Sequence, residues 1–395
     1  MDELIERGSN VIMNTYSRFP IALDHGEGMY VWDVKGKKYL DFVAGIAVNS
    51  LGYNHPKLTQ KISEQVKKLI HVSNLYYTEP QIELAEMLVQ NSDFDKVFFC
   101  NSGAESIEGA LKLCRKYATM KNKPGREIIT MFKSFHGRTY GAITATAQEK
   151  YQKGLDPLLP EISHVPFNDF ESLKHAVSDK TCGIIMEPIQ GEGGIIPAQK
   201  EYLEKVRALC DEKDILLIFD EIQTGVGRTG ELFCYQTYGI APDAATFAKG
   251  LAGGVPIGAL MVKDFAAKAF QPGDHASTFG GNSLATAAGT VVLHELLDNG
   301  LIENVKTQGD YLNKKLDQLK QKHSIVIDNR GIGLMRGIEL SIPAGPIVSD
   351  CINSGLLLVG AGSNVIRFVP ALIVTEKEID KAIDILDQAL TRASN

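Results

Sequence analysis

Short apolar runs alternate with longer amphipathic stretches through the middle of the chain. The apolar runs span residues 97–100, 127–131, 164–167, 183–187, 215–222, 244–248 and 257–262. The clearest amphipathic stretch, residues 200–213, repeats apolar side chains at helical spacing directly before the run at 215. This alternation is typical of βα units that build a mostly parallel sheet, so we predict an α/β fold.

The two ends of the chain carry a different pattern. Residues 23–42 place three glycines between aromatic and β-branched segments, which predicts a small antiparallel meander. From residue 301 a long polar helix reaches His323, and a final helix begins at Thr375, where Thr375 and Glu378 form a capping box. Between these helices we predict strands near 325 and at 334–340, 356–359 and 365–369.

These patterns predict two domains. We expect a large α/β domain over residues 50–290, and a smaller α+β domain built from residues 1–49 and 291–395. No internal repeat or low-complexity linker interrupts this organisation.

Composition and charge narrow the class of protein. The 395 residues hold 41 Lys and Arg against 48 Asp and Glu, a net charge of −7, with no basic tract, so a nucleic-acid partner is not expected. The longest apolar stretches are shorter than the roughly 18 residues of a membrane span. The first ten residues hold three acids and no apolar core, so we expect no export signal and a cytoplasmic protein. Six cysteines stand far apart without a C-x-x-C pair, which predicts buried free thiols.

Residues 101–105 follow the strand at 97–100 and open a helix that reaches about Thr119. Free N–H groups at the start of a helix bind anions, and Ser102, Gly103 and Ala104 suit a close phosphate contact. Ser102 as an ordinary helix cap is the alternative interpretation.

The strand at 215–222 ends in two acids, Asp220 and Glu221. A buried carboxylate needs a partner, and a cationic ligand atom would provide one. The alternative is an acid that caps a neighbouring helix.

Lys249 follows the apolar run at 244–248 and precedes several glycines. Burial lowers the pKa of a lysine, and a neutral amine can form an imine with an aldehyde. A lysine whose charged end reaches solvent is the alternative.

Phe135, His136, Gly137 and Arg138 form a loop after the strand at 127–131. The aromatic ring of Phe135 can stack on a flat cofactor, and the guanidinium of Arg138 can bind a carboxylate with two hydrogen bonds. His136 as a metal ligand or a catalytic base is less favoured, because no second histidine or cysteine lies at ligand spacing.

Together these four features describe a pyridoxal phosphate site. A strand-end acid keeps the pyridine nitrogen protonated, and a lysine holds the aldehyde. The order of the features along the chain, with the lysine 29 residues beyond Asp220, strengthens this interpretation.

A further signal comes from segments spread over nearly the whole chain: residues 14–20, 40–49, 101–105, 135–139, 187–194, 220–224, 248–250, 277–282 and 367–370. In these segments the sequence resembles the class III (ω-amino) aminotransferases of fold type I. The resemblance implies pyridoxal 5'-phosphate as cofactor and a homodimer whose active sites lie between two subunits.

The resemblance also implies roles for individual residues. Lys249 would be the Schiff-base lysine, Asp220 would contact the pyridine nitrogen, Gln223 the ring hydroxyl oxygen, and Thr278 the phosphate of the partner subunit's cofactor. The cofactor-binding set is Ser102, Gly103, Ala104, Phe135, Asp220, Glu221, Ile222, Gln223, Lys249 and Thr278, and the substrate-binding set is Tyr16, Arg138, Glu192, Ser277 and Arg367.

The activity implied by the resemblance is transfer of the terminal amino group of N2-acetyl-L-ornithine to 2-oxoglutarate, a step of arginine biosynthesis. Succinylornithine, 4-aminobutyrate and ornithine are alternative donors, although Ile46 stands where ornithine-specific members have a tyrosine. An aminomutase or decarboxylase on the same scaffold, or a non-catalytic relative, is the alternative outside this reaction. Ser283 and Ala371 replace prolines common in the family, which leaves substrate detail open.

Overall fold

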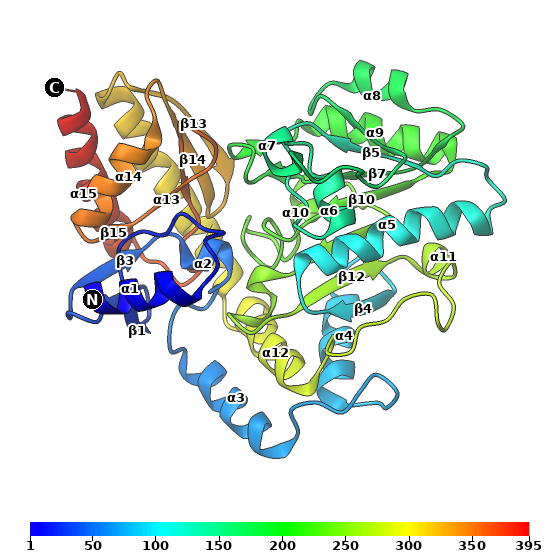
Figure 1. The fold of residues 1–395 in the computed structure, drawn as a ribbon, viewed down its shortest axis with the longest axis horizontal. Helices are drawn as coiled ribbons and strands as arrows, with labels where there is room; N and C mark the ends of the chain where they lie inside the picture. The colour runs from blue at the N-terminus through cyan, green and yellow to red at the C-terminus, as the bar shows by residue number, and fades with distance from the viewer. Residues whose placement is uncertain (395) are drawn as a thin grey trace.

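The structure, a computed structural model, describes residues 1–394, so Asn395, the last residue of the predicted small domain, lies outside the described residues. Figure 1 shows two bodies side by side: a large one from the middle of the chain and a smaller one in which the first and last segments of the chain meet. The predicted α/β fold is confirmed.

A seven-stranded sheet forms the centre of the large body, in the order β4-β12-β11-β10-β7-β5-β6. Only β12 runs against its neighbours β4 and β11, so the sheet is mostly parallel, as predicted. Its strands are β4 (Lys96–Cys100), β5 (Glu127–Met131), β6 (Ile162–Val165), β7 (Thr181–Met186), β10 (Leu216–Asp220), β11 (Ala244–Phe247) and β12 (Gly258–Val262).

The central strands are hydrophobic on both faces because helices cover both faces of the sheet. Every residue of β7 and β10 is buried, which matches the continuous apolar runs in the sequence. The helices and short helical turns of residues 44–297 are α2 (Ala44–Ala47), α3 (Pro56–Lys68), α4 (Glu79–Gln90), α5 (Gly103–Met120), α6 (Tyr140–Ala145), α7 (Glu149–Gln152), α8 (Phe170–Ala176), α9 (Lys200–Lys213), α10 (Cys234–Tyr238), the 3₁₀ turn η1 (Lys249–Ala252), α11 (Asp264–Ala267) and α12 (Ser283–Leu297). Helix α9 has the predicted bounds and buries its predicted apolar side chains.

The smaller body contains two four-stranded sheets. The N-terminal meander of β1 (Leu23–Glu27), β2 (Tyr30–Asp33) and β3 (Lys38–Asp41) is antiparallel, as predicted, and β15 (Leu356–Leu357) joins it in parallel beside β3. The second sheet has the order β13-β14-β17-β16, with β13 (Val326–Ile332), β14 (Met335–Leu340), β16 (Val359–Gly360) and β17 (Val365–Phe368). In the first of these two sheets, strands from both ends of the chain therefore lie side by side.

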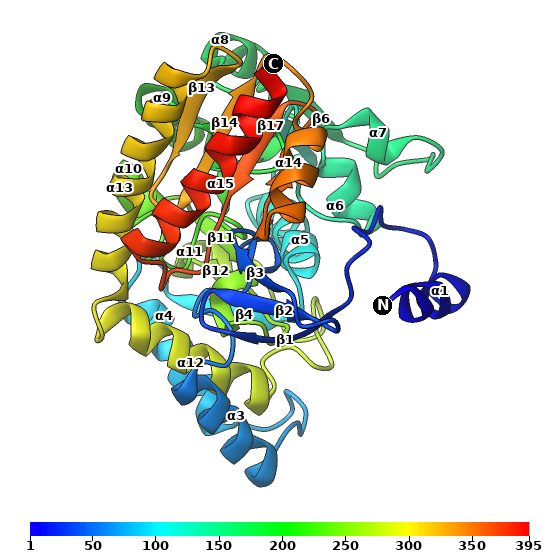
Figure 2. The same cartoon turned by 90° about the vertical axis from the view of Figure 1, so that its left-hand side faces the viewer.

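Helices α13 (Leu301–Lys322), α14 (Ala344–Asn353) and α15 (Glu376–Ser394) cover one face of the second sheet (Figure 2). Helix α15 begins after Thr375, so the predicted start is confirmed. Of the predicted capping box, one hydrogen bond is present: the backbone N–H of Thr375 donates to Glu378 Oε2.

Three predicted elements differ from the structure. Strand β10 ends at Asp220 rather than 222, because Asp220 Oδ1 accepts a hydrogen bond from the N–H of Ile222 and turns the chain. The predicted strand 356–359 is two strands, β15 and β16, which belong to different sheets. Lys249 does not end a strand: β11 stops at Phe247, and Lys249 opens the turn η1 with a φ of +44°.

The boundaries of the two predicted domains stay a prediction. Residue 290 lies inside α12, which packs against α3 and α4. We therefore propose that the second boundary follows α12, near residue 298, rather than interrupting this buried helix.

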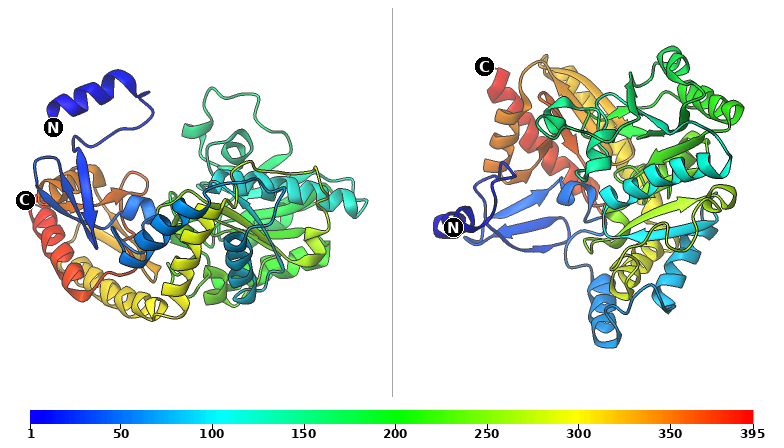
Figure 3. Two further views of the ribbon diagram at one scale, coloured as in Figure 1. Left: turned by 90° about the horizontal axis from the view of Figure 1, so that it is seen from below. Right: turned by 45° about the vertical axis from the view of Figure 1, so that its right-hand side comes forward.

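The first helix, α1 (Asp2–Val11), stands apart from the body of the chain and buries none of its residues (Figure 3). All six cysteines are buried and free, as predicted. Among residues 1–394, no helix combines the length and the apolar character needed to cross a membrane.

Candidate active site

A cavity of about 330 Å³ lies where the loops that follow β4, β5, β7, β10 and β11 converge. These loops leave the carboxyl ends of parallel strands, which is where open α/β sheets bind ligands. Of the residues predicted from sequence, Ser102, Gly103, Ala104, Phe135, Asp220, Ile222, Gln223 and Lys249 line this cavity. The four sequence features therefore meet in one place.

The N-terminus of α5 forms one wall of the cavity. Ser102 is the N-cap of α5, and its Oγ accepts a hydrogen bond from the N–H of Glu105 at 3.2 Å. The N–H groups of Gly103 and Ala104 belong to the first turn, where the helix offers them no acceptor of its own. A side chain on Gly103 would collide with Ile222, since a Cβ there would lie 2.7 Å from Ile222 Cδ1. The helix cap and the predicted anion site are therefore compatible.

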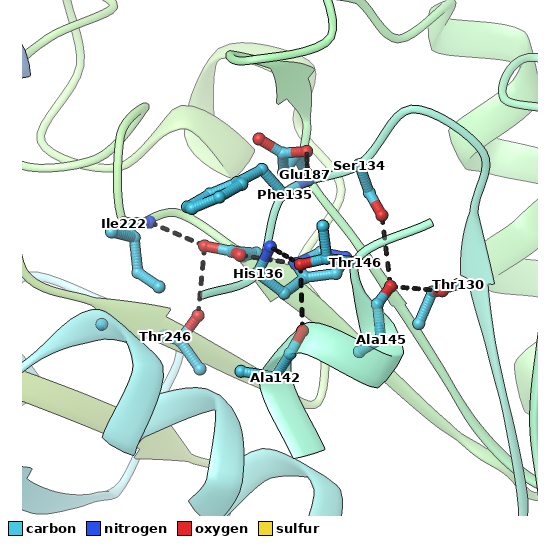
Figure 4. Close-up of polar contacts among 12 residues, drawn as sticks. Thr130, Ser134, Phe135, His136, Ala142, Ala145, Thr146, Glu187, Ile222 and Thr246 are labelled. Carbon is cyan, nitrogen blue, oxygen red and sulfur yellow. Dashed lines mark hydrogen bonds and ion pairs between the residues drawn. The ribbon is translucent and has the colours of Figure 1, made fainter. Parts of the chain in front are cut away.

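Asp220 is held by His136, a partner that the sequence did not reveal. Figure 4 shows His136 in its surroundings, with Thr146 and Phe135 nearby. The imidazole Nδ1 lies 2.7 Å from Asp220 Oδ2, and both side chains are buried. Burial lowers the pKa of His136, but the hydrogen bond and the charge of Asp220 outweigh this effect and raise the pKa overall. We infer that His136 fixes the carboxylate of Asp220 at the cavity wall.

Glu221, next to Asp220, is not among the cavity-lining residues. Its two carboxylate oxygens accept hydrogen bonds from the N–H groups of Cys234 and Tyr235, at 2.6 and 2.7 Å, at the start of α10. Burial raises the pKa of Glu221 to about 8. The alternative of a helix-capping acid therefore applies to Glu221 and not to Asp220, and direct contact of Glu221 with a cofactor finds no support here.

Glu187 is a second residue of the cavity that we did not predict individually. Its Oε2 accepts from the N–H of Phe135 and its Oε1 from the N–H of Gly191, both at 3.1 Å. Burial raises the pKa of Glu187 to about 7. This carboxyl group joins the loop of the predicted stacking ring to the loop that carries Glu192. Its sequence signals were its place at the end of the apolar run 183–187 and in the segment 187–194.

Lys249 lines the same cavity as Asp220 and Glu187. Burial, followed by the positive charge of Arg367, lowers the pKa of its amine to about 8. A substantial fraction of the amine is therefore neutral near neutral pH, as the chemistry predicted for this residue requires.

Arg367, on β17, forms an ion pair with Glu192, which lies in the turn between β8 (Ile189–Gln190) and β9 (Ile196–Pro197). The guanidinium is almost fully buried, and its Nη1 also donates to Gln223 Oε1 at 3.0 Å. Burial raises the pKa of Glu192, but the charge of Arg367 outweighs burial and lowers it overall. Both charges act on the pKa of Lys249, so the pair lies within electrostatic reach of the cavity.

Besides Glu221, Glu192 and Arg367, four predicted site residues do not line the cavity: Tyr16, Arg138, Ser277 and Thr278. Tyr16 is exposed near the N-terminus, and Arg138 stacks its guanidinium 4.0 Å above the ring of Tyr151. Ser277 Oγ accepts a hydrogen bond from Asn101 Nδ2 at 3.2 Å, and Thr278 lines a separate depression with Leu75 and Tyr77. The roles assigned to these four residues stay predictions.

Comparison with known proteins agrees with this geometry. The family model of the class III aminotransferases matches residues 11–390. The chain is 56% identical over 382 residues to an acetylornithine aminotransferase from Caldanaerobacter subterraneus subsp. tengcongensis, covering 96% of this chain and 97% of that protein. It is 50% identical to an acetylornithine aminotransferase from Clostridium acetobutylicum, covering 96% and 98% of the two chains.

Solved structures of similar proteins share the fold. The N-acetylornithine aminotransferase from Stenotrophomonas maltophilia matches with a TM-score of 0.85 and 36% identity, covering 98% of this chain and 99% of that chain. The ornithine aminotransferase from Toxoplasma gondii matches with a TM-score of 0.95 and 29% identity, covering 99% and 95%.

The fold and the site define an enzyme of the fold type I transferases that depend on pyridoxal phosphate. Within this class, the chain belongs to the class III aminotransferases. The predicted family is therefore confirmed.

The position of Lys249 predicts how its amine titrates in the cofactor-free protein. Reactivity toward acetic anhydride, measured by competitive labelling and peptide mapping, should reach half its maximum near pH 8, because the amine is protonated below its pKa and nucleophilic above it. Arg367→Ala should move this midpoint upward, since it removes a positive charge that lowers the pKa. Arg138→Ala is the control and should leave the midpoint unchanged. A midpoint near pH 10.5 in the unmodified protein would contradict the assignment.

Proposed function

We propose that this aminotransferase binds pyridoxal 5'-phosphate and moves the terminal amino group of N2-acetyl-L-ornithine to 2-oxoglutarate. The products are N-acetyl-glutamate 5-semialdehyde and glutamate, in arginine biosynthesis. One observation carries the proposal: a single cavity holds a histidine-bound strand-end carboxylate, a lysine of lowered pKa and the free end of a helix. The relatives named acetylornithine aminotransferase, at 50% identity and above, support this choice of donor.

The cavity fits the cofactor at each of its polar ends. The first turn of α5 offers N–H donors to a phosphate, and Gly103 leaves the space that a larger side chain would fill. The carboxylate of Asp220 lines the same cavity, where it can accept a hydrogen bond from a protonated ring nitrogen. Phe135 would cover one face of the ring, and the amide of Gln223 would donate to the ring hydroxyl oxygen.

Bound pyridoxal phosphate supplies an aldehyde for the amino group and a pyridinium ring that withdraws electrons. Asp220, fixed by His136, would accept the hydrogen bond of a protonated ring nitrogen. Nζ of Lys249 would hold the aldehyde group in the absence of a donor amine. When a donor amine takes its place, the amine of Lys249 would be free to take a proton from the carbon that bears the donor's nitrogen and to deliver it on the other side of that nitrogen, a 1,3 shift. Its lowered pKa suits both the nucleophilic and the basic role.

The donor reacts at its far end, so its α-carboxylate must be held away from the reacting carbon. We assign this role to Arg138. Its guanidinium stacks on the ring of Tyr151 and lies 5.5 Å from the ring centroid of Phe135, the residue expected to cover the cofactor ring. Tyr16 and Ser277 are the further donor contacts that we propose.

2-Oxoglutarate reacts at its α-carbon and needs a carboxylate anchor close to that carbon. We assign Arg367 to this anchor and Glu192 to its removable partner. While acetylornithine is bound, Glu192 pairs with Arg367 and masks its charge. When the α-carboxylate of 2-oxoglutarate arrives, Glu192 moves away. Its neighbours Gly191 and Gly193 have no side chains that would obstruct this movement. An ion pair with a purely structural role is the alternative.

A homodimer completes this proposal. Thr278 lies outside the cavity of its own chain, in a depression beside Leu75 and Tyr77, which are 85% and 94% exposed. Apolar side chains this exposed are typical of a protein interface. Thr278 would then contact the cofactor phosphate of the partner subunit.

A panel of donors tests the reaction. With 2-oxoglutarate as acceptor, N2-acetyl-L-ornithine should give the highest rate of glutamate formation, above succinylornithine, ornithine and 4-aminobutyrate. Lys249→Ala should fold and lose transamination by about a thousandfold or more, because it removes both the anchor and the base. A donor other than acetylornithine with the highest kcat/KM would replace the proposed substrate. Activity without 2-oxoglutarate would point instead to the aminomutase or decarboxylase alternative.

If Glu192 is the removable partner of Arg367, replacing either residue should shift the relative rates of the two half-reactions in opposite directions. Glu192→Ala should raise the rate of the glutamate half-reaction relative to that of acetylornithine, because it exposes Arg367. Arg367→Ala should slow the glutamate half-reaction roughly ten- to hundredfold more than the acetylornithine half-reaction, since the charge-assisted bonds to the α-carboxylate are lost. Stopped-flow absorbance of the cofactor measures each half separately. Equal losses for both substrates in both variants would leave only the structural ion pair.

A mixed dimer tests the role of Thr278. Lys249→Ala and Thr278→Asp should each be inactive alone, the second because its carboxylate repels the phosphate. Co-expression should restore about a quarter of the normal activity, because half of randomly paired dimers are mixed and each has one intact site. A purified mixed dimer without activity would place Thr278 in its own subunit's site, and full activity of Thr278→Asp alone would place it in neither site.

A further inference from the structure

The turn that carries Glu192 is held at both ends by groups outside it. At the first end, Gly191 donates its N–H to Glu187 at 3.1 Å, and Glu187 is buried in the large body of the protein. Gly193 lies so close to the carbonyl of Lys133 that a Cβ there would be 2.7 Å from that oxygen. The first half of the turn is therefore fixed to the loops around the cavity.

The second end of the turn is held by Arg330, which belongs to β13 of the smaller body. Its Nε donates to the carbonyl of Gly194 at 2.9 Å and to the carbonyl of Ile195 at 3.1 Å. No other side chain of residues 1–394 donates a hydrogen bond to either carbonyl. Arg330 therefore connects the Glu192 turn to a sheet that also contains Arg367.

The backbone at this end is in a conformation that needs external support. Gly194 and Ile195 have φ values of +114° and +53°. The left-handed region is unfavourable for a β-branched residue such as Ile195, so this conformation persists only where the surroundings impose it. Ile195 is fully buried, and the two bonds from Arg330 fix its carbonyl and the one before it.

Arg330 is itself held in place from the other side. Its Nη1 donates to Glu339 on β14 and to Asp328 on β13, the latter at 3.1 Å. Lys320 also pairs with Asp328, at 3.3 Å, but does not contact the turn. Because Nη1 is bound to these two acids, the guanidinium is oriented with its Nε toward the turn.

We propose that Arg330 is a positioning residue for substrate selection: it holds the Gly194–Ile195 end of the turn so that Glu192 stays on Arg367. This inference rests on the proposed exchange of Glu192 between substrates. Without Arg330, the Gly194–Ile195 end of the turn would lose its side-chain hydrogen bonds to the smaller body, and Glu192 would cover Arg367 for less of the time. Arg367 would then be more available to the α-carboxylate of glutamate.

A double-mutant cycle tests whether Arg330 acts through Glu192. The measured quantity is the rate constant of the glutamate half-reaction divided by that of acetylornithine, at subsaturating substrate. Arg330→Ala should raise this ratio about fivefold in the otherwise unchanged enzyme, and by less than about twofold in the Glu192→Ala background. An equal rise in both backgrounds, or no rise in the first, would overturn the proposal.

Matched variants separate this role from general stability. Lys320→Ala removes an ion pair to the same Asp328 without touching the turn, and should leave the ratio unchanged. Arg330→Lys keeps the charge but not the fork that bonds the turn and the acids together, so it should raise the ratio as well. Arg330→Lys also keeps the test decisive if Arg330→Ala fails to fold. A lowered melting temperature with an unchanged ratio in either Arg330 variant would show a merely structural residue and overturn the proposal.

Hydrogen exchange gives a readout that does not depend on activity. In the cofactor-free protein, a peptide that covers residues 189–197 should exchange its amide hydrogens faster in Arg330→Ala and normally in Lys320→Ala. Unchanged exchange in Arg330→Ala would contradict the anchoring role. If wild-type enzyme rejects acetylornithine, the proposed donor fails, but the same ratio with whichever ω-amine it accepts still tests Arg330.

Discussion

Every charge buried around the cavity requires a partner, and the rest of the site follows from how this requirement is met. Asp220 has His136, Arg367 has Glu192, and Glu187 has two backbone N–H groups. Lys249 has no such direct partner among the described contacts, and its amine responds by a lowered pKa rather than by pairing. The group without a direct partner is thus the one from which the chemistry needs a neutral amine. Because Arg367, Glu192, Asp220 and Glu187 all act on the pKa of Lys249, a change at any one of them alters the protonation of this amine.

The sequence predicts those parts of the fold that depend on local pattern. Helix α9 and strand β5 have the predicted bounds because their periodicity and their flanking residues are sufficient to define them. Residues 356–359 read as one apolar strand, yet Leu357 pairs with Asp41 and Val359 with Arg367. The first of these partners lies 316 residues away in the chain, and such a distant contact leaves no mark in the local pattern. The end of β10 depends likewise on the side chain of Asp220 bonding its own backbone, a choice that the apolar pattern does not record.

The site is predictable to a similar degree. The motifs that follow β4, β5, β10 and β11 meet because parallel strands end at the same edge of the sheet. Asp220 and Glu221 show the limit of the sequence. Adjacent side chains at a strand end point to opposite faces of the sheet, so the two acids are expected to face in opposite directions. Which of them reaches the cavity depends on His136, 84 residues earlier, and on the start of α10. The interpretation of Glu221 as a cofactor contact therefore finds no support.

The strand β15 completes the sheet of the N-terminal meander, and this pairing has a consequence for how the protein is made. Leu40 pairs with Leu356, so 316 residues separate the two strands in the chain. At ribosomal rates of about 5–20 residues per second, the interval between them is roughly 15 to 60 s. During that time the open edge of β3 emerges without its partner, and an open strand edge is a template for pairing with other chains. Folding of this protein in the cell therefore depends on protection of its first-made segment until its last-made segment arrives.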